Sequence, residues 1–536
     1  MIRRIQPDVA ETLREALARR GYDHAGLKRV LGIGAGGFVD ISSGPLLMRR
    51  TADGLPLSTM VRLFIGGASV EAGAAERALD PVGLGEAARA GLIESDPLDP
   101  SLVRATVALV PYEDLVLAAD FSRRTSGEIA REFDHVMGVG RSSAALGKLA
   151  RGAAKGRRGG GGSVRDGSAG AACGGAGRVL DLGCGCGYLA LRMAGAFESA
   201  IGTDVNERAV GMSVFNARLN GLPNATFRLG SMTDPVAGES FDLVVTNPPF
   251  VISPETGQVY RDGARRPEAG GARGHGDEFC SWIARHAPGV LRDDGVLVML
   301  VNWSHGEGDD GSGRLSSWAP PGMQAWVLRT DTQRVDEYAS MWIRHTESGT
   351  PGWSEAMFAD RFDRWMKHYG SLGIERISYG AMVVRRARPA FFEFDSMETA
   401  WIDSGAVDVA RGLDGRAAVA AVEADHRDEG VLAGRWRVAP DVRVLQRMAP
   451  RDGAWRAVEA TVTIGGTDDA TGRSGRPVCG GDPAAVESVL RVDGKRALVQ
   501  VVDETASMTG RERSSLRAQA ARIARALARE GGLTPV

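Results

Sequence analysis

Short apolar runs alternate with longer stretches of helical periodicity along the middle of the chain. This alternation, with polar and glycine-containing turns between segments, predicts a parallel sheet covered by helices on both faces. The predicted strands are 178–181, 200–204, 226–229, 241–246, 295–301, 325–329 and 374–385, and the predicted helices are 188–196, 208–220, 278–291 and 354–369. We therefore expect an α/β domain over residues 123–389.

The residues before this domain show a different pattern. Helical patterns at 8–21, 57–64, 70–79 and 84–90 precede two alternating runs, 103–109 and 115–118, which predict a hairpin. Helices followed by a hairpin indicate an N-terminal winged-helix-like domain over residues 1–122. Such domains bind nucleic acid or protein, or pack on a neighbouring domain, and no basic helix selects one of these roles.

Residues 390–536 combine strand-like runs with a closing helix. The strands are predicted at 391–394, 442–445, 458–463 and 497–502, and the helix at 514–529. This pattern predicts a C-terminal α+β accessory domain. Three polar, glycine-rich stretches, 151–177, 304–317 and 465–482, are expected to be flexible and solvent-exposed.

Composition narrows the class of protein. The formal net charge of −2 gives the protein no overall electrostatic attraction to nucleic acid or to an anionic membrane. Five scattered cysteines predict no disulfide framework and fit a reducing compartment. The start of the chain lacks the apolar core of a signal peptide, and no apolar run reaches the roughly 18 residues of a membrane span. We expect a cytoplasmic protein without a membrane segment, and no residue spacing predicts a metal site.

A glycine loop follows the first predicted strand of the α/β domain. The sequence Asp181-Leu182-Gly183-Cys184-Gly185-Cys186-Gly187 lets the backbone turn sharply and approach a ligand closely. Its spacing differs from the Gly-x-Gly-x-x-Gly loop of dinucleotide enzymes. The carboxylate of Asp181 would repel a pyrophosphate but suits a cationic amino-acid ligand. S-adenosylmethionine carries an ammonium and a sulfonium, so this loop favours it over NAD.

The ends of the next two predicted strands supply further candidates for binding this cofactor. Asp204 lies about 20 residues after the glycines, where a carboxylate accepts hydrogen bonds from ribose hydroxyls. Asn206 is expected to assist it. Ser231 and Met232 follow the third strand, where the backbone passes the adenine ring and Met232 covers one face of it, although a simple turn fits this segment equally well.

The most specific segment is Asn247-Pro248-Pro249-Phe250, at the end of a buried strand. Two prolines fix the backbone, so the Asn247 side-chain oxygen and the Pro248 carbonyl hold a set geometry. These oxygens can accept both hydrogens of a planar NH₂ group and direct its lone pair toward a methyl donor. Phe250 can stack on the flat acceptor. We expect Asn247, Pro248 and Phe250 to be the catalytic residues, with Asn247 also contacting the cofactor.

With these residues in view, residues 135–303 resemble class I S-adenosylmethionine-dependent methyltransferases with an Asn-Pro-Pro-Tyr/Phe motif. They most resemble the PrmC/HemK type, especially its larger actinobacterial members. The matching segments are 136–143, 180–187, 203–206, 247–251, 260–263, 276–277 and 302–303. The resemblance implies a Rossmann-like fold and N5-methylation of a glutamine, typically in a peptide-release factor. It assigns the cofactor to Asp181, Gly183, Gly185, Gly187 and Asp204, and the target amide to residues 247–250.

The sequence also departs from this family. Phe250 replaces the usual tyrosine, compact members lack the C-terminal domain, and glycine- and arginine-rich residues intrude between Arg261 and Asp277. These departures leave the substrate open between a protein glutamine and an exocyclic base amine (adenine N6 or guanine N2) in RNA or DNA. Asp181 and the 247–250 motif argue against an NAD-dependent oxidoreductase, and the intact motifs argue against a non-catalytic binding protein.

Overall fold

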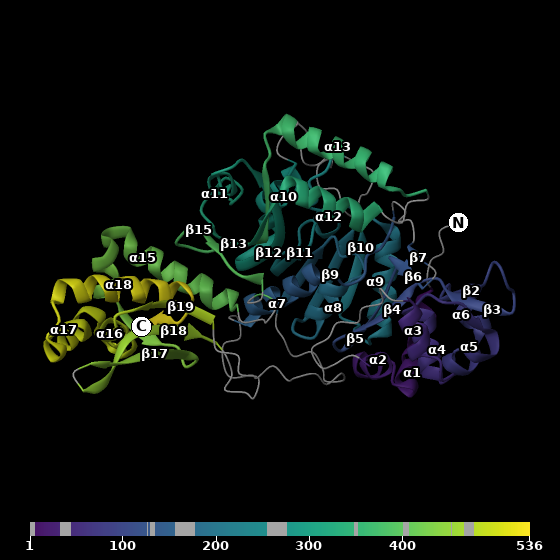
Figure 1. Ribbon diagram of the computed structural model, residues 1–536, viewed down its shortest axis with the longest axis horizontal. Helices are drawn as coiled ribbons and strands as arrows, with labels where there is room; N and C mark the ends of the chain where they lie inside the picture. Colours follow the sequence, from purple (N-terminus) through teal and green to yellow (C-terminus); the bar gives the residue numbers. More distant parts are fainter. Residues whose placement is uncertain are drawn as a thin grey trace. The chain divides into compact units, whose positions relative to one another are not determined.

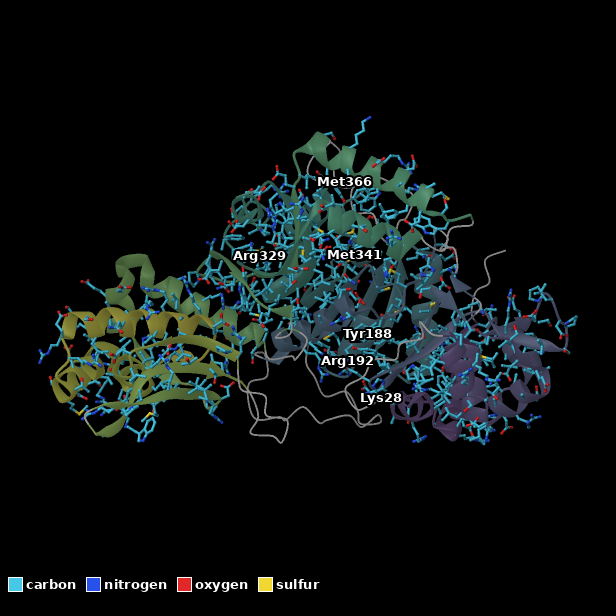
Figure 2. All side chains as sticks on the ribbon, in the orientation of Figure 1. Lys28, Tyr188, Arg192, Arg329, Met341 and Met366 are labelled. Atoms are coloured by element: carbon cyan, nitrogen blue, oxygen red, sulfur yellow. The ribbon has the colours of Figure 1, made fainter. Side chains whose placement is uncertain are left out.

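Figure 1 shows a computed structural model of the chain, and Figure 2 shows its side chains in the same orientation. It describes residues 6–32, 44–125, 127–128, 134–155, 177–254, 276–347, 352–399, 402, 407–451, 453–465 and 476–536. The chain divides into two compact units. The first comprises Met1–Gly147, Ser163–Trp318 and Asp331–Ala381, and the second comprises Lys148–Gly162, Ala319–Thr330 and Met382–Val536. The domain boundaries expected from the sequence, after residues 122 and 389, stay predictions.

The large sheet is built from the predicted apolar runs. Its strands are β8 (Arg178–Leu182), β9 (Ser199–Asp204), β10 (Ala225–Leu229), β11 (Phe241–Thr246), β12 (Leu291–His305), β13 (Gln324–Arg334), β14 (Arg376–Arg385) and β15 (Phe391–Ser396). Hydrogen-bonded neighbours follow the order β10-β9-β8-β11-β12-β14-β13-β15. The pairs from β10 to β12 are parallel. Because β8 and β11 are buried on both faces, their sequences are almost continuously apolar. The predicted Rossmann-like α/β sheet is confirmed.

Helices connect the strands of this sheet. They include α8 (Tyr188–Ala194), α9 (Glu207–Leu219), α10 (Glu278–His286), α11 (Ser312–Ser316), α12 (Val335–Glu347) and α13 (Glu355–Leu372), with α7 (Arg141–Lys155) before β8. Short 3-10 helices lie at Asp234–Val236 and Ala287–Val290. The sequence predicts α8, α9, α10 and α13 but misses α12. This helix packs against α13 and contributes Tyr338, Ala339 and Ile343 to a buried cluster.

The N-terminal region belongs to the first unit and precedes the strands of the large sheet in the chain. Its helices are η1 (Pro7–Val9), α1 (Ala10–Arg20), α2 (His24–Leu31), α3 (Gly44–Arg50), α4 (Pro56–Phe64), α5 (Ala72–Leu79) and α6 (Leu84–Arg89). Its strands are β1 (Val70–Glu71), β2 (Ile93–Ser95), β3 (Leu102–Ala105), β4 (Ala108–Tyr112), β5 (Leu115–Ala119), β6 (Arg123–Arg124) and β7 (Gly127–Glu128). The predicted hairpin exists as β4 and β5.

One predicted strand of this region is wrong in its extent. The run 103–109 divides into β3, which pairs with β1 and β2, and β4, which pairs with β5. The alternation of apolar residues continues through Thr106 and Val107 and gives no sign of this change of partner. The winged-helix-like character of the region stays a prediction.

The C-terminal part of the second unit contains both predicted kinds of element. Its helices are α15 (Val409–Ala433), α16 (Pro483–Leu490), α17 (Leu498–Thr509) and α18 (Arg513–Arg529). Its strands are β16 (Arg435–Val438), β17 (Val442–Arg451), β18 (Ala454–Ile464), β19 (Arg476–Gly481), β20 (Asp493–Ala497) and β21 (Leu533–Pro535). They form two three-stranded sheets, β17-β18-β19 and β20-β16-β21.

The strand predicted at 497–502 is wrong, because α17 begins at Leu498. Leu498, Val501, Val502 and Thr505 are buried at helical spacing along this helix. A short apolar run does not distinguish a strand from the start of a buried helix, and the periodicity becomes clear only beyond residue 502.

The flexible stretch expected at 304–317 is also wrong. Strand β12 continues to His305, and α11 occupies residues 312–316. Arg314 donates to the buried carboxylate of Asp277 at 2.7 Å, and the Trp303 indole donates to the Asp310 carbonyl at 2.8 Å. The buried Asp277 carboxylate requires a charged partner, and Arg314 supplies it. This contact orders the segment around Arg314 despite its polar composition. The other two glycine-rich stretches lie mostly outside the described residues, at 156–176 and 466–475.

Within the described ranges, no helix has the length and apolar character that crossing a membrane requires. The cytoplasmic location expected from the sequence stays a prediction. The same ranges contain no group of three His, Cys, Asp or Glu side chains arranged to hold a metal ion.

Candidate active site

A cavity of about 720 Å³ lies in the first unit, where β8, β9 and β11 end. This is the edge at which parallel sheets bind ligands. Among the residues predicted from sequence, the cavity is lined by Gly183, Gly185, Asp204, Asn206, Met232, Asn247, Pro248 and Phe250. Asp181, Gly187 and Ser231 do not line it. The fold therefore brings together segments that lie up to about 70 residues apart in the chain.

The glycine loop runs from β8 into α8. Gly183, Gly185 and Gly187 have φ angles of 70°, 54° and 82°, in the left-handed region that glycine adopts most readily. A Cβ atom at Gly183 or Gly185 would meet nothing within 4 Å, so these positions leave space beside the backbone. A Cβ at Gly187 would lie 2.8 Å from Ser213 Oγ. Gly187 is thus required for packing, whereas Gly183 and Gly185 open the cavity.

Asp181 lies at the base of this loop and is 1% exposed. Its Oδ2 accepts a hydrogen bond from the Ala190 backbone N–H at 3.0 Å. Its Oδ1 is buried and has no hydrogen-bond partner among the described residues. Burial raises the pKa of the Asp181 carboxyl to about 7, with a smaller contribution from the charge of Asp204. A cationic ligand would restore the interaction that the buried oxygen lacks, which fits an ammonium group.

The Asp204 carboxylate is held at the end of β9. Its Oδ2 accepts from the Gly185 N–H and its Oδ1 accepts from the Asn206 N–H, both at 2.9 Å. Each carboxylate oxygen can accept more than one hydrogen bond, so ribose hydroxyls can still bind. Asn206 itself caps α9 by accepting from Arg208 N–H at 2.9 Å, and its Nδ2 donates to the Asp134 carbonyl at 2.8 Å. Its direct contact with the cofactor stays a prediction.

Ser231 and Met232 form the turn after β10. Met232 has a φ of 48°, which is uncommon outside glycine, and its carbonyl accepts from Thr203 Oγ1 at 3.0 Å. The Ser231 carbonyl accepts from the Asp234 N–H at 2.9 Å. Met232 reaches the cavity, so a contact between its side chain and an adenine ring remains consistent with the geometry.

Asn247 has one half of its amide engaged and the other half without a partner. Its Nδ2 donates to Ser143 Oγ at 2.9 Å, which fixes the orientation of the side chain. Its Oδ1 is buried and accepts no hydrogen bond from any described residue. An acceptor oxygen that is buried, oriented and unused costs stability, and such atoms are found at functional sites.

The segment after Asn247 is held by two tyrosines that the sequence analysis missed. The Ile252 N–H donates to the Tyr338 hydroxyl at 3.1 Å, and the Tyr369 hydroxyl donates to the Ile252 carbonyl at 2.7 Å. Phe250 contacts Trp342 edge-on, with ring centroids 6.2 Å apart. Because α12 and α13 lie more than 80 residues after the motif, no local pattern could place these side chains beside it.

Other lining residues were also missed as site residues. They come from the segment before α7, from the first turn of α7 and from α12, and they include Asp134, His135, Ser142, Ser143, Trp342, His345 and Thr346. Residues 136–143 carry part of the family resemblance, which was the one sequence feature that pointed to this wall. The matching segment at 260–263 lies outside the described residues.

The two cysteines of the glycine loop are not reactive thiols. Burial raises the pKa of Cys186 to about 11 and raises the pKa of Cys184 well above its usual value. Both side chains therefore remain neutral at physiological pH, and they act as small apolar residues in the wall of the cavity.

The raised pKa of the Asp181 carboxyl leads us to expect that cofactor binding depends on pH. Because its pKa is raised to about 7, the free protein gains stability from this carboxyl at low pH and loses that contribution as the pH rises through 7. A cationic ligand needs the ionised form, so its affinity should rise between pH 6 and pH 8, by up to about tenfold per pH unit below the pKa. Calorimetric titration with S-adenosylmethionine at several pH values measures this.

Asp181→Asn is the control for this dependence. The variant should bind more weakly at pH 8 and show a flat affinity over the same range. A wild-type affinity that is constant from pH 6 to pH 8 would contradict the assigned role.

Two segments of the chain match family models built from known proteins. Residues 172–261 match the methyltransferase small domain, and residues 19–106 match a domain of unknown function, DUF7059. The release factor glutamine methyltransferase of Xylella fastidiosa is 34% identical over 132 residues, covering 24% of this chain and 48% of that protein. The ribosomal protein uL3 glutamine methyltransferase of Xanthomonas campestris pv. campestris is 33% identical over 132 residues, covering 24% and 42%.

A third relative carries a different description. An uncharacterized RNA methyltransferase of Geobacter sulfurreducens is 42% identical over 76 residues, covering 13% of this chain and 15% of that protein. The chain thus spans about half the length, or less, of these relatives. Together with the sheet topology, the matches confirm the resemblance to methyltransferases of the PrmC/HemK type.

Proposed function

We propose that this protein is an S-adenosylmethionine-dependent N-methyltransferase that modifies the side-chain amide of a glutamine in a protein. The observation that carries this proposal is the buried, unpartnered Oδ1 of Asn247 in the lining of the cavity. The relatives described as glutamine methyltransferases of a release factor and of ribosomal protein uL3 support the choice of acceptor. A peptide-release factor is the substrate that we expect first.

The cavity and the glycine loop that lines it fit the proposed methyl donor, with Asp181 at the base of the loop and not in the lining itself. The unpartnered Asp181 oxygen suits its ammonium, the space at Gly183 and Gly185 suits a closely bound ligand, and Asp204 suits its ribose. The donor supplies a methyl group bound to a sulfonium. Transfer breaks the bond between carbon and sulfur, leaves the electron pair on sulfur and forms a bond to the amide nitrogen, which releases one proton.

The chain's own contribution is to orient a poor nucleophile. An amide nitrogen shares its lone pair with the adjacent carbonyl. Asn247 Oδ1 and the Pro248 carbonyl can accept the two amide hydrogens, which draws the nitrogen toward a pyramidal geometry and directs its lone pair at the methyl group. The same oxygens stabilise the positive charge that develops on nitrogen. Ser143 keeps Asn247 in the required rotamer, and Phe250 covers the flat face of the amide.

A labelling experiment tests the acceptor. The purified full-length protein is incubated with methyl-labelled S-adenosylmethionine and cell extract, and the products are digested separately with protease and with nuclease. We expect label in N5-methylglutamine after complete hydrolysis of the protein fraction. Release of the label by nuclease alone would overturn the glutamine assignment in favour of a base amine, and absence of any label would overturn methyl transfer. Heat-inactivated protein is the control.

A further inference from the structure

The edge of strand β5 is bonded along its length by side chains of helix α9. The Ala118 N–H donates to Asn216 Oδ1 at 2.7 Å, and Asn216 Nδ2 donates to the Ala118 carbonyl at 3.0 Å. The same double hydrogen bond joins Asn220 to Val116, at 2.9 and 2.8 Å. The helix therefore takes the place of a neighbouring strand for these peptide groups, whose other neighbour is β4.

Asn216 does more than satisfy the strand. Its Nδ2 also donates to the Cys186 carbonyl of the glycine loop at 2.9 Å, and the side chain is completely buried. One amide thus joins the N-terminal region to the loop that lines the cavity. Asn220 makes the equivalent two bonds to Val116 of β5. Its remaining bond goes to the Asn216 carbonyl within α9 and not to the glycine loop.

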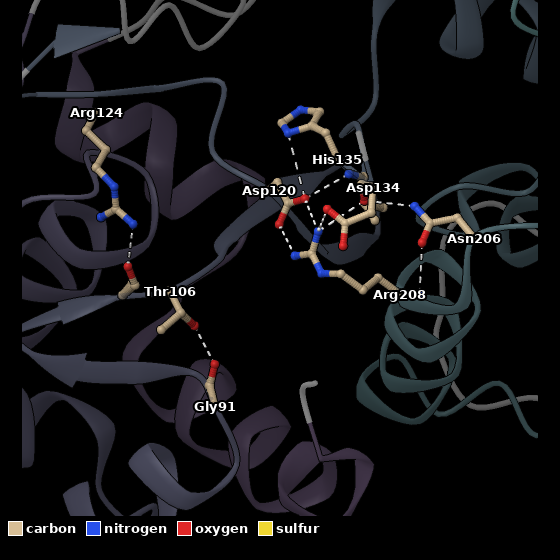
Figure 3. A network of polar contacts seen from close by, with 10 residues as sticks. Gly91, Thr106, Asp120, Arg124, Asp134, His135, Asn206 and Arg208 are labelled. Carbon is tan, nitrogen blue, oxygen red and sulfur yellow. Dashed lines mark hydrogen bonds and ion pairs between the residues drawn. The ribbon is translucent and has the colours of Figure 1, made fainter. Parts of the chain in front are cut away.

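A second connection lies at the residue that follows β5. The Asp120 carboxylate accepts from both terminal nitrogens of Arg208, at 2.8 and 2.6 Å (Figure 3). It also accepts from the Val136 N–H at 2.8 Å. The Asp120 N–H donates to the Val136 carbonyl at 3.0 Å. Arg208 and Asn206 both donate to the Asp134 carbonyl, at 3.1 and 2.8 Å. Residues 134–139 form a wall of the cavity, so Asp120 fixes the start of that wall.

We propose that the N-terminal region is part of the cofactor site, and that Asn216 and Asp120 are the positioning residues through which it acts. This inference rests on the proposed function, because the ligand of the cavity is taken to be S-adenosylmethionine. Asn216 holds the glycine loop in its ligand-binding shape, and Asp120 holds the wall at residues 134–139. Neither side chain lines the cavity, so we expect their loss to lower cofactor affinity and to spare the methyl-transfer step.

Asn220→Ala is the matched control for Asn216→Ala. Both variants remove the hydrogen bonds to the N–H and the C=O of one β5 residue, and both should lower the thermal unfolding temperature. Asn216→Ala alone also releases the glycine loop. We expect it to raise the Kd for S-adenosylhomocysteine about tenfold, whereas Asn220→Ala changes this Kd less than about twofold. Equal weakening by the two variants would overturn the proposal, because it would mean that affinity follows stability.

Asp120→Asn is the second test, and it keeps the shape of the side chain while it removes the charge that pairs with Arg208. We expect its KM for S-adenosylmethionine to rise about tenfold while kcat stays within about twofold of the wild type. A KM equal to that of the wild type would overturn the role of Asp120, whatever Asn216→Ala does.

Hydrogen exchange of the ligand-free full-length protein separates this proposal from the proposed function. Backbone amides at 183–187 should exchange faster in Asn216→Ala, amides at 134–139 should exchange faster in Asp120→Asn, and neither set should change in Asn220→Ala. These results require no ligand. Wild-type protein that binds no S-adenosylhomocysteine would overturn the proposed function, whereas unchanged exchange in all variants would overturn the positioning role alone.

Discussion

Asn247→Ala is expected to reduce kcat for methyl transfer about 100- to 1,000-fold, the range found when one oriented hydrogen-bonding group is removed from an active site. The reason is that the buried Oδ1 has no partner among the described residues and is therefore available to accept a hydrogen bond from the acceptor amide. Affinity for S-adenosylmethionine should change less than about threefold, because Asp181 and Asp204 remain. Single-turnover kinetics and calorimetry measure the two quantities.

Ser143→Ala provides a graded comparison. It removes the hydroxyl that accepts from Asn247 Nδ2 at 2.9 Å but leaves the Oδ1 acceptor in place. We expect a loss of about tenfold in kcat, because a mispositioned acceptor still functions in part of the population. Unchanged turnover in Asn247→Ala would refute the catalytic role of Asn247. The role proposed for Ser143, which is to orient Asn247, would then be refuted as well.

Asp204→Ala should have the second large effect, a weakening of S-adenosylmethionine binding by about 100-fold or more. The carboxylate is expected to bind the ribose hydroxyls, and it also accepts from the Gly185 N–H and the Asn206 N–H. Its removal therefore loosens the glycine loop in addition to deleting the ribose contact. Calorimetric titration with S-adenosylhomocysteine measures the loss.

Asp204→Asn separates these two effects. It keeps an acceptor oxygen but loses the negative charge, so we expect a smaller loss of about tenfold. At saturating S-adenosylmethionine both variants should recover much of the wild-type kcat. Wild-type affinity in Asp204→Ala would exclude the ribose contact.

The part of the fold that the sequence predicts best is the part where local pattern and tertiary environment agree. Strands β8, β9 and β11 are largely apolar because they are buried on both faces, and the glycines after β8 have the positive φ angles that only glycine adopts readily. The cavity accordingly contains Gly183, Gly185, Asp204 and Asn247.

The parts that the sequence did not predict depend on contacts between distant residues. Tyr338 and Tyr369 support the segment after the motif through bonds to Ile252 that span 86 and 117 residues. Asn216 bonds to Ala118 across 98 residues. In a helix, an asparagine that faces solvent and one that pairs a distant strand have the same local sequence pattern. The segment at 304–317 was misjudged for the same reason, since its order comes from the bond between Arg314 and Asp277.

Asn216 and Asn220 are four residues apart, whereas Val116 and Ala118, which they bond, are two residues apart. Four residues of an α-helix rise about 6 Å, and two residues of a strand rise about 6.6 Å. The two spacings agree within the tolerance of a hydrogen bond. Both asparagines can therefore bond the strand at once only while the residue spacing in α9 and in β5 stays as it is. A residue inserted between Val116 and Ala118 would prevent the two asparagines from pairing with the strand at the same time. An extra residue in the turn between β4 and β5 would leave the spacing of the two pairs unchanged.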